Sequence, residues 1–411
     1  MKIFTLAHFL RHVSVPRLQA FTQAHPIAEH LRFDWQQSPE AIPGRLNAAV
    51  AELLATAKGQ SPEDEAASVC HAVFLWQDDL RRVHLLSNEA AGFEFRVGLS
   101  DDPQALATIG QWDARDQALW VFHERPQLFR DVELHLAFQA KANGRSWKKH
   151  RIEPGLCLTA DRSQLEAFSH EVAKLYEKAG AGKSTHIEQS VCASDGSIQY
   201  TIYVEGPVTA LSHFTEQRFH RLTTRIALET ALVYQPETGD IESVVKGGAK
   251  NHKAVLQLFS KYLAGREIAP QRIGKARYSL NELRSGVAMH DDLSPLGVDR
   301  VRLRRAQLRP RTNTASAIRI EASPEQDQDD ALELARKKLH VDHLFEAEYD
   351  LDAVCILVYL ASNDGHRAKR FSFEVYSAGS STIKNLSEKN QPIAQAVLKS
   401  LQLAEPEEAL A

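Results

Sequence analysis

The strongest constraint on the fold is a change in hydrophobic period partway along the 411-residue chain. Before about residue 155, apolar side chains recur at the spacing of amphipathic helices. Later segments alternate apolar and polar side chains, which is the period of a half-buried strand. We therefore predict an α+β fold, in which a helical N-terminal region is followed by antiparallel β-hairpins with packed helices. The helical spacing is shown by Leu6, Phe9, Leu10 and Val13, and the strand period by Ile198, Tyr200, Ile202 and Val204.

Turn signals separate the strands of the later segments. Asp195-Gly196 stands directly before the strand at 198–204, and an Asp-Gly pair is a strong hairpin signal. Asn363-Asp364-Gly365 follows the apolar run Val354–Leu360, which we expect to be a strand buried on both faces. With a usual domain size of roughly 100–200 residues, we predict a mostly helical domain at 1–155, an α+β domain with a basic strand at 156–325, and an α+β subdomain with an acidic tail at 326–411.

Composition and the first segment bear on the class of protein. Hydrophobic residues make up 43% of the chain and charged residues 25%, which are ordinary values for a globular protein. The opening MKIFTLAHFLRHV contains His8, Arg11 and His12, so it lacks the apolar run of a signal peptide. The run Ala353–Ala361 is far shorter than the roughly 20 residues of a membrane helix. We expect a cytoplasmic protein that has no membrane partner.

The four cysteines are scattered and form no C-x-x-C pair. This spacing predicts neither a disulfide framework nor a thiolate zinc site. We expect each cysteine to be reduced and to serve as a small buried hydrophobic residue. They are Cys70, Cys157, Cys192 and Cys355.

The segment from Ala179 to Thr185 reads AGAGKST and is similar to a phosphate-binding P-loop. A P-loop needs a glycine five residues before its Gly-Lys pair, and that position is Glu177 here. A helical pattern also precedes the segment and a strand pattern follows it, which is the reverse of a P-loop. We expect the end of a helix and a turn rather than a nucleotide site.

Two further groups of residues invite a catalytic or metal-binding interpretation, and neither has the spacing that this chemistry requires. One is a histidine-rich group without a His-Glu-x-x-His framework, and the other lacks the Glu-x-Lys element of a nuclease. We assign no catalytic residue, and we expect no metal and no cofactor. The groups are His340, Asp342, His343 and Glu346, and Asp240, Glu242 and Lys246.

The basic segment RVRLRRAQLRPR at 300–311 is the best functional lead. As a strand, it places alternate arginines on one face and Val301 and Leu303 on the other. Residues 241–311 contain 15 Lys and Arg against 6 Asp and Glu, although the whole chain carries a net charge of −4. The planar guanidinium donates two parallel hydrogen bonds to phosphate. We predict that nucleic acid or another polyanion binds at Arg300, Arg302, Arg304, Arg305 and Arg309.

A second basic segment, RSWKKHR at 145–151, places an aromatic ring among cations. Stacking combined with charge is typical of proteins that bind single strands, so we add Arg145, Trp147, Lys148 and Lys149 to the predicted nucleic-acid-binding residues. The alternative for both segments is a solvated edge strand protected by charge, or pairing with the acidic remainder of the chain.

Six short blocks spread along the chain resemble a family of bacterial proteins whose activity is uncharacterised. The resemblance implies one long architecture and no particular catalytic residues. Members of this family are associated with mobile-element or phage-defence gene clusters, so the resemblance implies a nucleic-acid role, such as DNA binding in antiviral defence. The blocks are Phe9-Leu10-Arg11 with Val13, Phe122-His123-Glu124-Arg125, Ser146-Trp147, Gly180-x-Gly182-Lys183 with Ile187-Glu188, Tyr278-x-Leu280-x-x-Leu283 and Phe371-x-Phe373.

Three hypotheses follow from the sequence. The leading one is a non-enzymatic component that binds nucleic acid or another polyanion, with protein partners in a bacterial defence or regulatory assembly. The second is a nuclease or other hydrolase whose site is assembled from residues distant in sequence. The third is a protein–protein scaffold that does not contact nucleic acid. Whether the protein is an enzyme stays open at this point.

Overall fold

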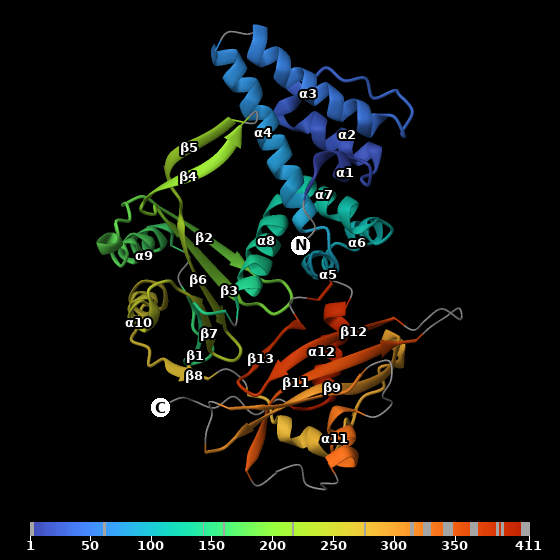
Figure 1. The fold of residues 1–411 in the computed structure, drawn as a ribbon. Coiled ribbons are helices and arrows are strands. Elements are labelled where there is room, and N and C mark those ends of the chain that lie inside the picture. The colour runs from blue at the N-terminus through green and yellow to red at the C-terminus, as the bar shows by residue number, and fades with distance from the viewer. Residues whose placement is uncertain are drawn as a thin grey trace. The chain divides into compact units, whose positions relative to one another are not determined.

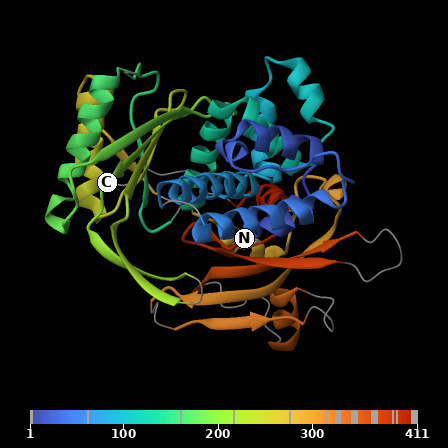
Figure 2. The ribbon, with the colours of Figure 1, turned by 90° about the horizontal axis from the view of Figure 1, so that it is seen from above.

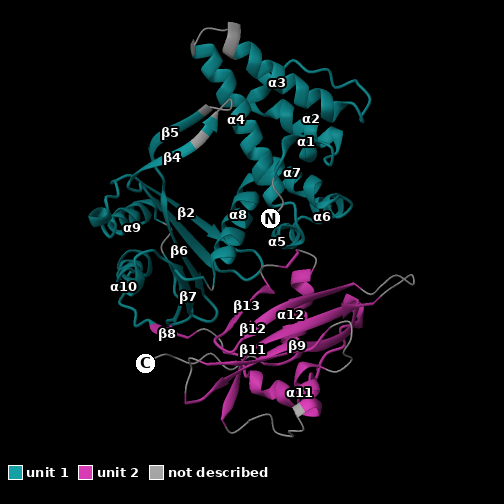
Figure 3. Cartoon of the chain, viewed as in Figure 1, with its two compact units in different colours: residues 1–270 teal, residues 271–411 magenta. Residues whose placement is uncertain are grey.

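The structure is a computed structural model that describes residues 4–60, 63–142, 144–158, 161–215, 218–274, 277–312, 316–323, 330–339, 348–361, 369–383, 386–387 and 390–403. The chain forms two compact units, residues 1–270 and 271–411 (Figure 3). The predicted α+β class is confirmed, because helices come first and antiparallel sheets follow. Within the described ranges, no helix combines the length and the apolar character that crossing a membrane requires.

Helices open the first unit, and the apolar faces of most of them meet in one core. Side chains of Asn88, Asp102 and Asp113 accept hydrogen bonds from backbone N–H groups and so cap α5, α6 and α7. Phe95 and Trp76 are among the fully buried side chains of this core. The helices are α1 (Leu6–Leu10), α2 (Val15–Ala24), α3 (Ile42–Gln60), α4 (Glu63–Leu85), α5 (Glu89–Gly98), α6 (Pro103–Ile109), α7 (Ala114–Glu124) and α8 (Pro126–Lys141), with a 3-10 turn at Pro26–Glu29.

An antiparallel sheet completes the first unit, with its strands in the order β2-β3-β6-β7-β1. Helices α9 and α10 lie side by side against one face (Figures 1 and 2), and α8 covers the other. The bounds are β1 (Trp147–Arg151), α9 (Arg162–Lys174), β2 (Thr185–Val191), β3 (Ile198–Val204), β6 (Leu228–Gln235), β7 (Asp240–Val244) and α10 (Gly248–Phe259) with a π-helical turn at Ser260–Ala264.

Strand β3 was predicted to be half-buried, and this is wrong because α8 covers its polar face. Gln199 and Thr201 are 4% and 1% exposed. The amide of Gln199 donates to the carbonyl oxygen of Leu134 on α8 at 3.1 Å and to the hydroxyl of Thr201 at 3.0 Å. Polar side chains on this face are therefore buried with hydrogen-bond partners rather than solvated.

The second unit is built on a sheet with the strand order β10-β9-β11-β12-β13. Strand β11 is buried over most of its length, as the apolar run predicted. Helices α11 and α12 contribute Leu332 and Val397 to the core, while the predicted turn at 363–365 lies outside the described residues. The elements are β8 (Gln271–Ile273), 3-10 turns at Leu280–Ser285 and Ser294–Leu296, β9 (Val298–Pro310), β10 (Ile318–Glu321), α11 (Ala331–Leu339), β11 (Tyr349–Leu360), β12 (Arg370–Tyr376), β13 (Ser380–Ser381) and α12 (Asn390–Ser400).

The compact units divide at 270/271, whereas the predicted domain boundaries were 155/156 and 325/326. β1 from the helical part pairs with β7, and β9 pairs with β11, so each predicted boundary would separate hydrogen-bonded strands.

Candidate functional site

The arginine-rich segment forms strand β9, as predicted, but its arginines do not share one solvent-facing side. In the register with β11, Arg305 lies opposite Cys355 and Leu303 lies opposite the next residue, Ile356. Arg304 is therefore the extra residue of a β-bulge, which shifts the alternation of the strand by one position. As a result, Arg300, Arg302 and Arg305 lie on the same face. Arg302 is only 5% exposed, so the expectation that it faces solvent is wrong.

Several of these arginines are engaged by neighbouring side chains. Arg304 Nη2 lies 3.2 Å from Glu321 Oε1, and Arg305 forms an ion pair with Glu374. The guanidinium carbon of Arg300 lies 4.6 Å from the centroid of a tyrosine ring on β11, which is a cation–π contact. Pairing within the chain, one of the alternatives left open by the sequence, is therefore observed for these arginines.

The C-terminal end of β9 borders a cavity of about 590 Å³. Arg309 Nη2 lies 2.7 Å from Asp352 Oδ2, and Arg311 Nη2 lies 2.9 Å from Asp350 Oδ1. In both pairs the arginine Nε donates to the same carboxylate oxygen. The hydrogen bond from Arg311 lowers the pKa of Asp350. This end of the strand therefore presents two guanidinium groups whose positions are fixed by carboxylates.

Arg277 and Asn281 are further polar residues that line this cavity. The Asn281 amide nitrogen donates to Asp350 Oδ1 at 3.0 Å, and its oxygen accepts from the backbone N–H of Leu351 at 2.9 Å. Arg277 is exposed and has no ion-pair partner among the residues that the structure describes. Sequence reasoning missed Arg277 because it stands apart from the arginine-rich strand.

The second basic segment forms β1 and is held within its sheet. Trp147 is 9% exposed, and its indole nitrogen donates to Glu242 Oε2 at 2.7 Å. Lys149 Nζ lies 2.9 Å from Asp240 Oδ2. Because β1 pairs with β7 and the Trp147 ring packs in a core cluster, the ring does not present a stacking surface, and that expectation is wrong. Arg145 is exposed beside this strand.

Lys148 and the carboxylates of the nuclease-like group lie on the paired strands β1 and β7. Lys148 is half-buried on β1, opposite Ser243 in the register with β7. Burial opposes ionisation of Asp240, but hydrogen bonds from Arg151 and Lys149 lower its pKa. The carboxylates of the nuclease-like group are thus bound to neighbouring cations and to an indole.

The Gly-Lys loop has the helix-to-strand context that the sequence predicted. A 3-10 turn at Glu177–Ala179 ends at Gly180, whose φ of 82° is the left-handed conformation of a helix C-cap, and β2 follows. The backbone N–H of Gly182 donates to the Glu205 carbonyl oxygen at 2.8 Å. The histidine-rich group around His340 lies outside the described residues.

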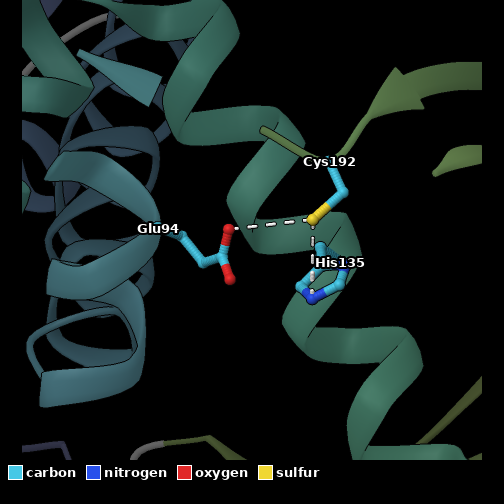
Figure 4. A group of neighbouring side chains, drawn as sticks. All are labelled: Glu94, His135 and Cys192. Atoms are coloured by element: carbon cyan, nitrogen blue, oxygen red, sulfur yellow. Dashed lines mark hydrogen bonds between the residues drawn. The ribbon is translucent and has the colours of Figure 1, made fainter. Parts of the chain in front are cut away.

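Glu94, His135 and Cys192 form a cluster that sequence reasoning missed (Figure 4). They come from α5, from α8 and from the residue directly after β2. The Cys192 sulfur lies 3.7 Å from Glu94 Oε2 and 3.8 Å from His135 Nε2. The Ser194 hydroxyl donates to Glu94 Oε1 at 2.9 Å and lies 3.1 Å from the sulfur.

This cluster borders a small hollow of about 10 Å³, which is about the room that one water molecule needs. Leu128, Val132, Val191 and Ala193 form the apolar part of its lining. Burial raises the pKa of the Cys192 thiol, although a hydrogen bond with the Ser194 side chain opposes that rise. The thiol is therefore less acidic than an ordinary cysteine, which is unfavourable for a cysteine nucleophile.

The cysteines differ from the expectation that each is a small buried hydrophobic residue. All four are free, as predicted, but Cys157 is exposed and Cys70 is half-buried. Cys192 is buried among polar groups.

The hairpin of β4 (Val208–Thr215) and β5 (Arg218–Arg225) extends from the sheet of the first unit (Figure 1). Phe214 and Phe219 lie opposite each other near its tip, 73% and 53% exposed, with ring centroids 5.6 Å apart. Leu211 and Leu222 form a second exposed pair. Exposed apolar side chains gathered in this way are typical of a surface that contacts another molecule.

Comparison with known proteins adds no assignment to these sites. Neither a protein-family model nor a curated protein sequence significantly matches the chain. The resemblance described above therefore stays a prediction, and functional inference depends on the geometry of the sites.

Proposed function

We propose that the protein is a non-enzymatic nucleic-acid-binding component whose second unit holds phosphate groups at the C-terminal end of β9. The observation that best supports this proposal is the cavity of about 590 Å³ lined by Arg309, Arg311 and Arg277. Its volume lies within the range of roughly 300–1,000 Å³ that ligand sites in proteins have. A single nucleotide is small enough to enter such a space.

Arg309 and Arg311 are oriented before any ligand arrives. Each guanidinium is held by an aspartate, yet the two arginine side chains are 36% and 51% exposed. An arginine fixed in this way loses little conformational entropy when it binds a phosphate oxygen. Its planar donors can address two oxygens at once, which favours phosphate over a simple point charge such as chloride.

The charge of the cavity favours an anion. Asp350 and Asp352 compensate two of the lining arginines. Arg277, which forms no ion pair within the described part of the chain, leaves an excess of positive charge. Its exposed guanidinium can meet a phosphate without first breaking an existing ion pair.

The length of β9 favours a polymer over a small phosphate compound. At a rise of about 3.3 Å per residue, the span from Arg300 to Arg309 is about 30 Å. Phosphates follow one another about every 3.4 Å along each strand of duplex DNA, so a span of this length meets several of them. Arg300 is exposed, and the Arg304 side chain is 39% exposed, so both can take part.

Arg277→Gln tests this proposal with little risk to folding, because the residue is exposed. Binding of single-stranded DNA, duplex DNA and RNA is measured by fluorescence anisotropy at several salt concentrations. Loss of one phosphate contact should make the slope of log affinity against log salt shallower by about 0.7 for single strands or about 0.9 for duplex DNA. Arg162→Gln is the matched control, because Arg162 is 92% exposed on α9 in the first unit, and its slope should equal that of the wild type.

The outcomes separate the alternatives. Failure of the wild type to bind any of the three polymers at low salt would overturn the proposal. An unchanged slope in a folded Arg277→Gln variant would exclude this cavity as the phosphate site. The strands should be recovered intact after incubation with magnesium, and their cleavage would instead support the nuclease hypothesis.

A further inference from the structure

We propose that Glu94, His135 and Cys192 bind one Zn²⁺ ion that ties helices α5 and α8 to the end of β2. The site is independent of the proposed nucleic-acid interface, because all three residues belong to the first unit and the cavity belongs to the second.

The donor set and its spacing match this metal. Zinc takes thiolate sulfur at about 2.3 Å and imidazole nitrogen or carboxylate oxygen at about 2.0–2.2 Å, in tetrahedral arrangement. The Cys192 thiol would release its proton to solvent when the ion binds. These bond lengths place a sulfur ligand about 3.6 Å from a nitrogen or oxygen ligand. The Cys192 sulfur lies 3.7 Å from Glu94 Oε2 and 3.8 Å from His135 Nε2. All three donor atoms lie within 4.8 Å of one another, so small side-chain rotations bring them around one ion.

The ligands are held by packed elements and by an outer hydrogen bond. Helices α5 and α8 contact each other through Phe95 and Phe129, whose rings are stacked with centroids 6.1 Å apart. The Ser194 hydroxyl donates to Glu94 Oε1, which leaves Oε2 directed to the sulfur (Figure 4). Hydrogen bonds of this kind orient a ligand and raise the affinity of the site for its metal.

The size of the hollow indicates a structural role for the ion. Its volume of about 10 Å³ accommodates a fourth ligand of the size of water. Glu94 and Cys192 are 8% and 7% exposed, and the remaining lining is apolar apart from Asp131. A substrate does not fit beside the ion in this space. The ion would therefore stabilise the junction between the helices and the sheet.

Cobalt provides the test, because Co²⁺ replaces Zn²⁺ and gives a charge-transfer absorption band when a thiolate binds it. The full chain, stripped of metal with a chelator, should show this band with one equivalent of Co²⁺ and lose it when Zn²⁺ is added. Its melting temperature should rise with Zn²⁺, because an ion that binds only the folded state stabilises it. Cys192→Ser should abolish the band. Cys157→Ser, which removes the exposed thiol, should retain it.

Ser194→Ala gives a second, milder variant that keeps every ligand. It should weaken metal affinity by about 10- to 100-fold while the protein stays folded, because only the outer hydrogen bond is lost. Absence of the cobalt band in the wild type would overturn the proposal. So would a band that survives in Cys192→Ser or disappears in Cys157→Ser, and so would unchanged affinity in Ser194→Ala.

Discussion

Two tyrosines in the first unit form a matched pair for testing how buried hydroxyl groups affect stability. Tyr200 on β3 and Tyr234 on β6 are both 0% exposed and belong to the same core. The Tyr234 hydroxyl accepts from the backbone N–H of Leu156 at 2.9 Å and donates to the Glu153 carbonyl oxygen at 3.2 Å. The buried Tyr200 hydroxyl has no hydrogen-bond partner among the residues described. Substitution by phenylalanine removes one hydroxyl group in each case.

The expected changes in the free energy of unfolding have opposite signs. Tyr234→Phe leaves a buried N–H unsatisfied, which costs about 1–3 kcal/mol, so we expect a loss of about 2 kcal/mol. Tyr200→Phe removes a hydroxyl that is desolvated without compensation, so we expect a gain of about 1 kcal/mol. The two variants should differ by about 3 kcal/mol. For a unit of this size, that corresponds to melting temperatures about 6–12 °C apart.

Urea denaturation followed by circular dichroism measures both variants against the wild type. A similar midpoint shift in both variants would refute the reasoning, because it would mean that the Tyr200 hydroxyl is also bonded. The slope of free energy against urea concentration should stay constant, so that the midpoint alone reports stability.

Alkaline pH gives a second measurement of the same hydroxyl group. Burial raises the pKa of Tyr200 to about 12, above its ordinary value of about 10. A raised pKa means that the folded state favours the protonated phenol. The contribution of the protonated Tyr200 phenol to the stability of the folded state is therefore complete below pH 10, and it is lost as pH rises toward 12. Tyr200→Phe should remove this part of the decline, whereas a decline identical to that of the wild type would contradict the assignment.

Two further predictions concern ion pairs and thiols. Arg82 donates to both carboxylate oxygens of Glu133, and Arg130 donates to one of them. Burial opposes ionisation of Glu133, but these bonds lower its pKa below the ordinary value of roughly 4.3. Their contribution to the stability of the folded state is therefore present above that pH and is lost at lower pH. Glu133→Gln should lower the free energy of unfolding by about 2 kcal/mol at neutral pH. The exposed control Glu166→Gln should lower it by at most about 0.5 kcal/mol. Equal unfolding midpoints of the two variants in urea would contradict this prediction. Alkylation of the native protein, read by mass spectrometry, should modify exposed Cys157 first and buried Cys192 and Cys355 only on unfolding; an intramolecular disulfide would contradict the free thiols.

Local patterns predicted much of the fold because each reports on short-range structure. The helical period of the N-terminal region and the apolar run of β11 both gave the correct element. Tertiary packing places α8 against the polar face of β3. The burial of that face therefore could not be predicted from the alternation of apolar and polar residues alone. The domain boundaries also depend on strand pairing between distant segments, which no local pattern encodes.

The prediction of the sites was limited for the same reason, because it also depends on contacts between distant segments. Alternation placed Arg300, Arg302 and Arg304 on one face, and a single bulge at Arg304 changed this. A bulge leaves no reliable mark in a sequence, because it depends on the pairing register with the partner strand. The cluster of Glu94, His135 and Cys192 depends on contacts between α5, α8 and the end of β2, and isolated Glu, His and Cys residues are too common to assemble without the fold.

Both proposals concern places where the structure departs from simple rules of burial and alternation. A buried carboxylate is costly unless it is hydrogen-bonded, paired with a charge or bound to a cation. The cluster at Cys192 places a carboxylate, an imidazole and a thiol together below a largely apolar lining, and one divalent cation would neutralise that arrangement. At the end of β9, paired arginines line a cavity that Arg277, which has no ion pair among the described residues, makes positively charged. The first arrangement favours a small cation and the second a larger anion, so metal removal should lower the stability of the first unit without changing the salt dependence of nucleic-acid binding.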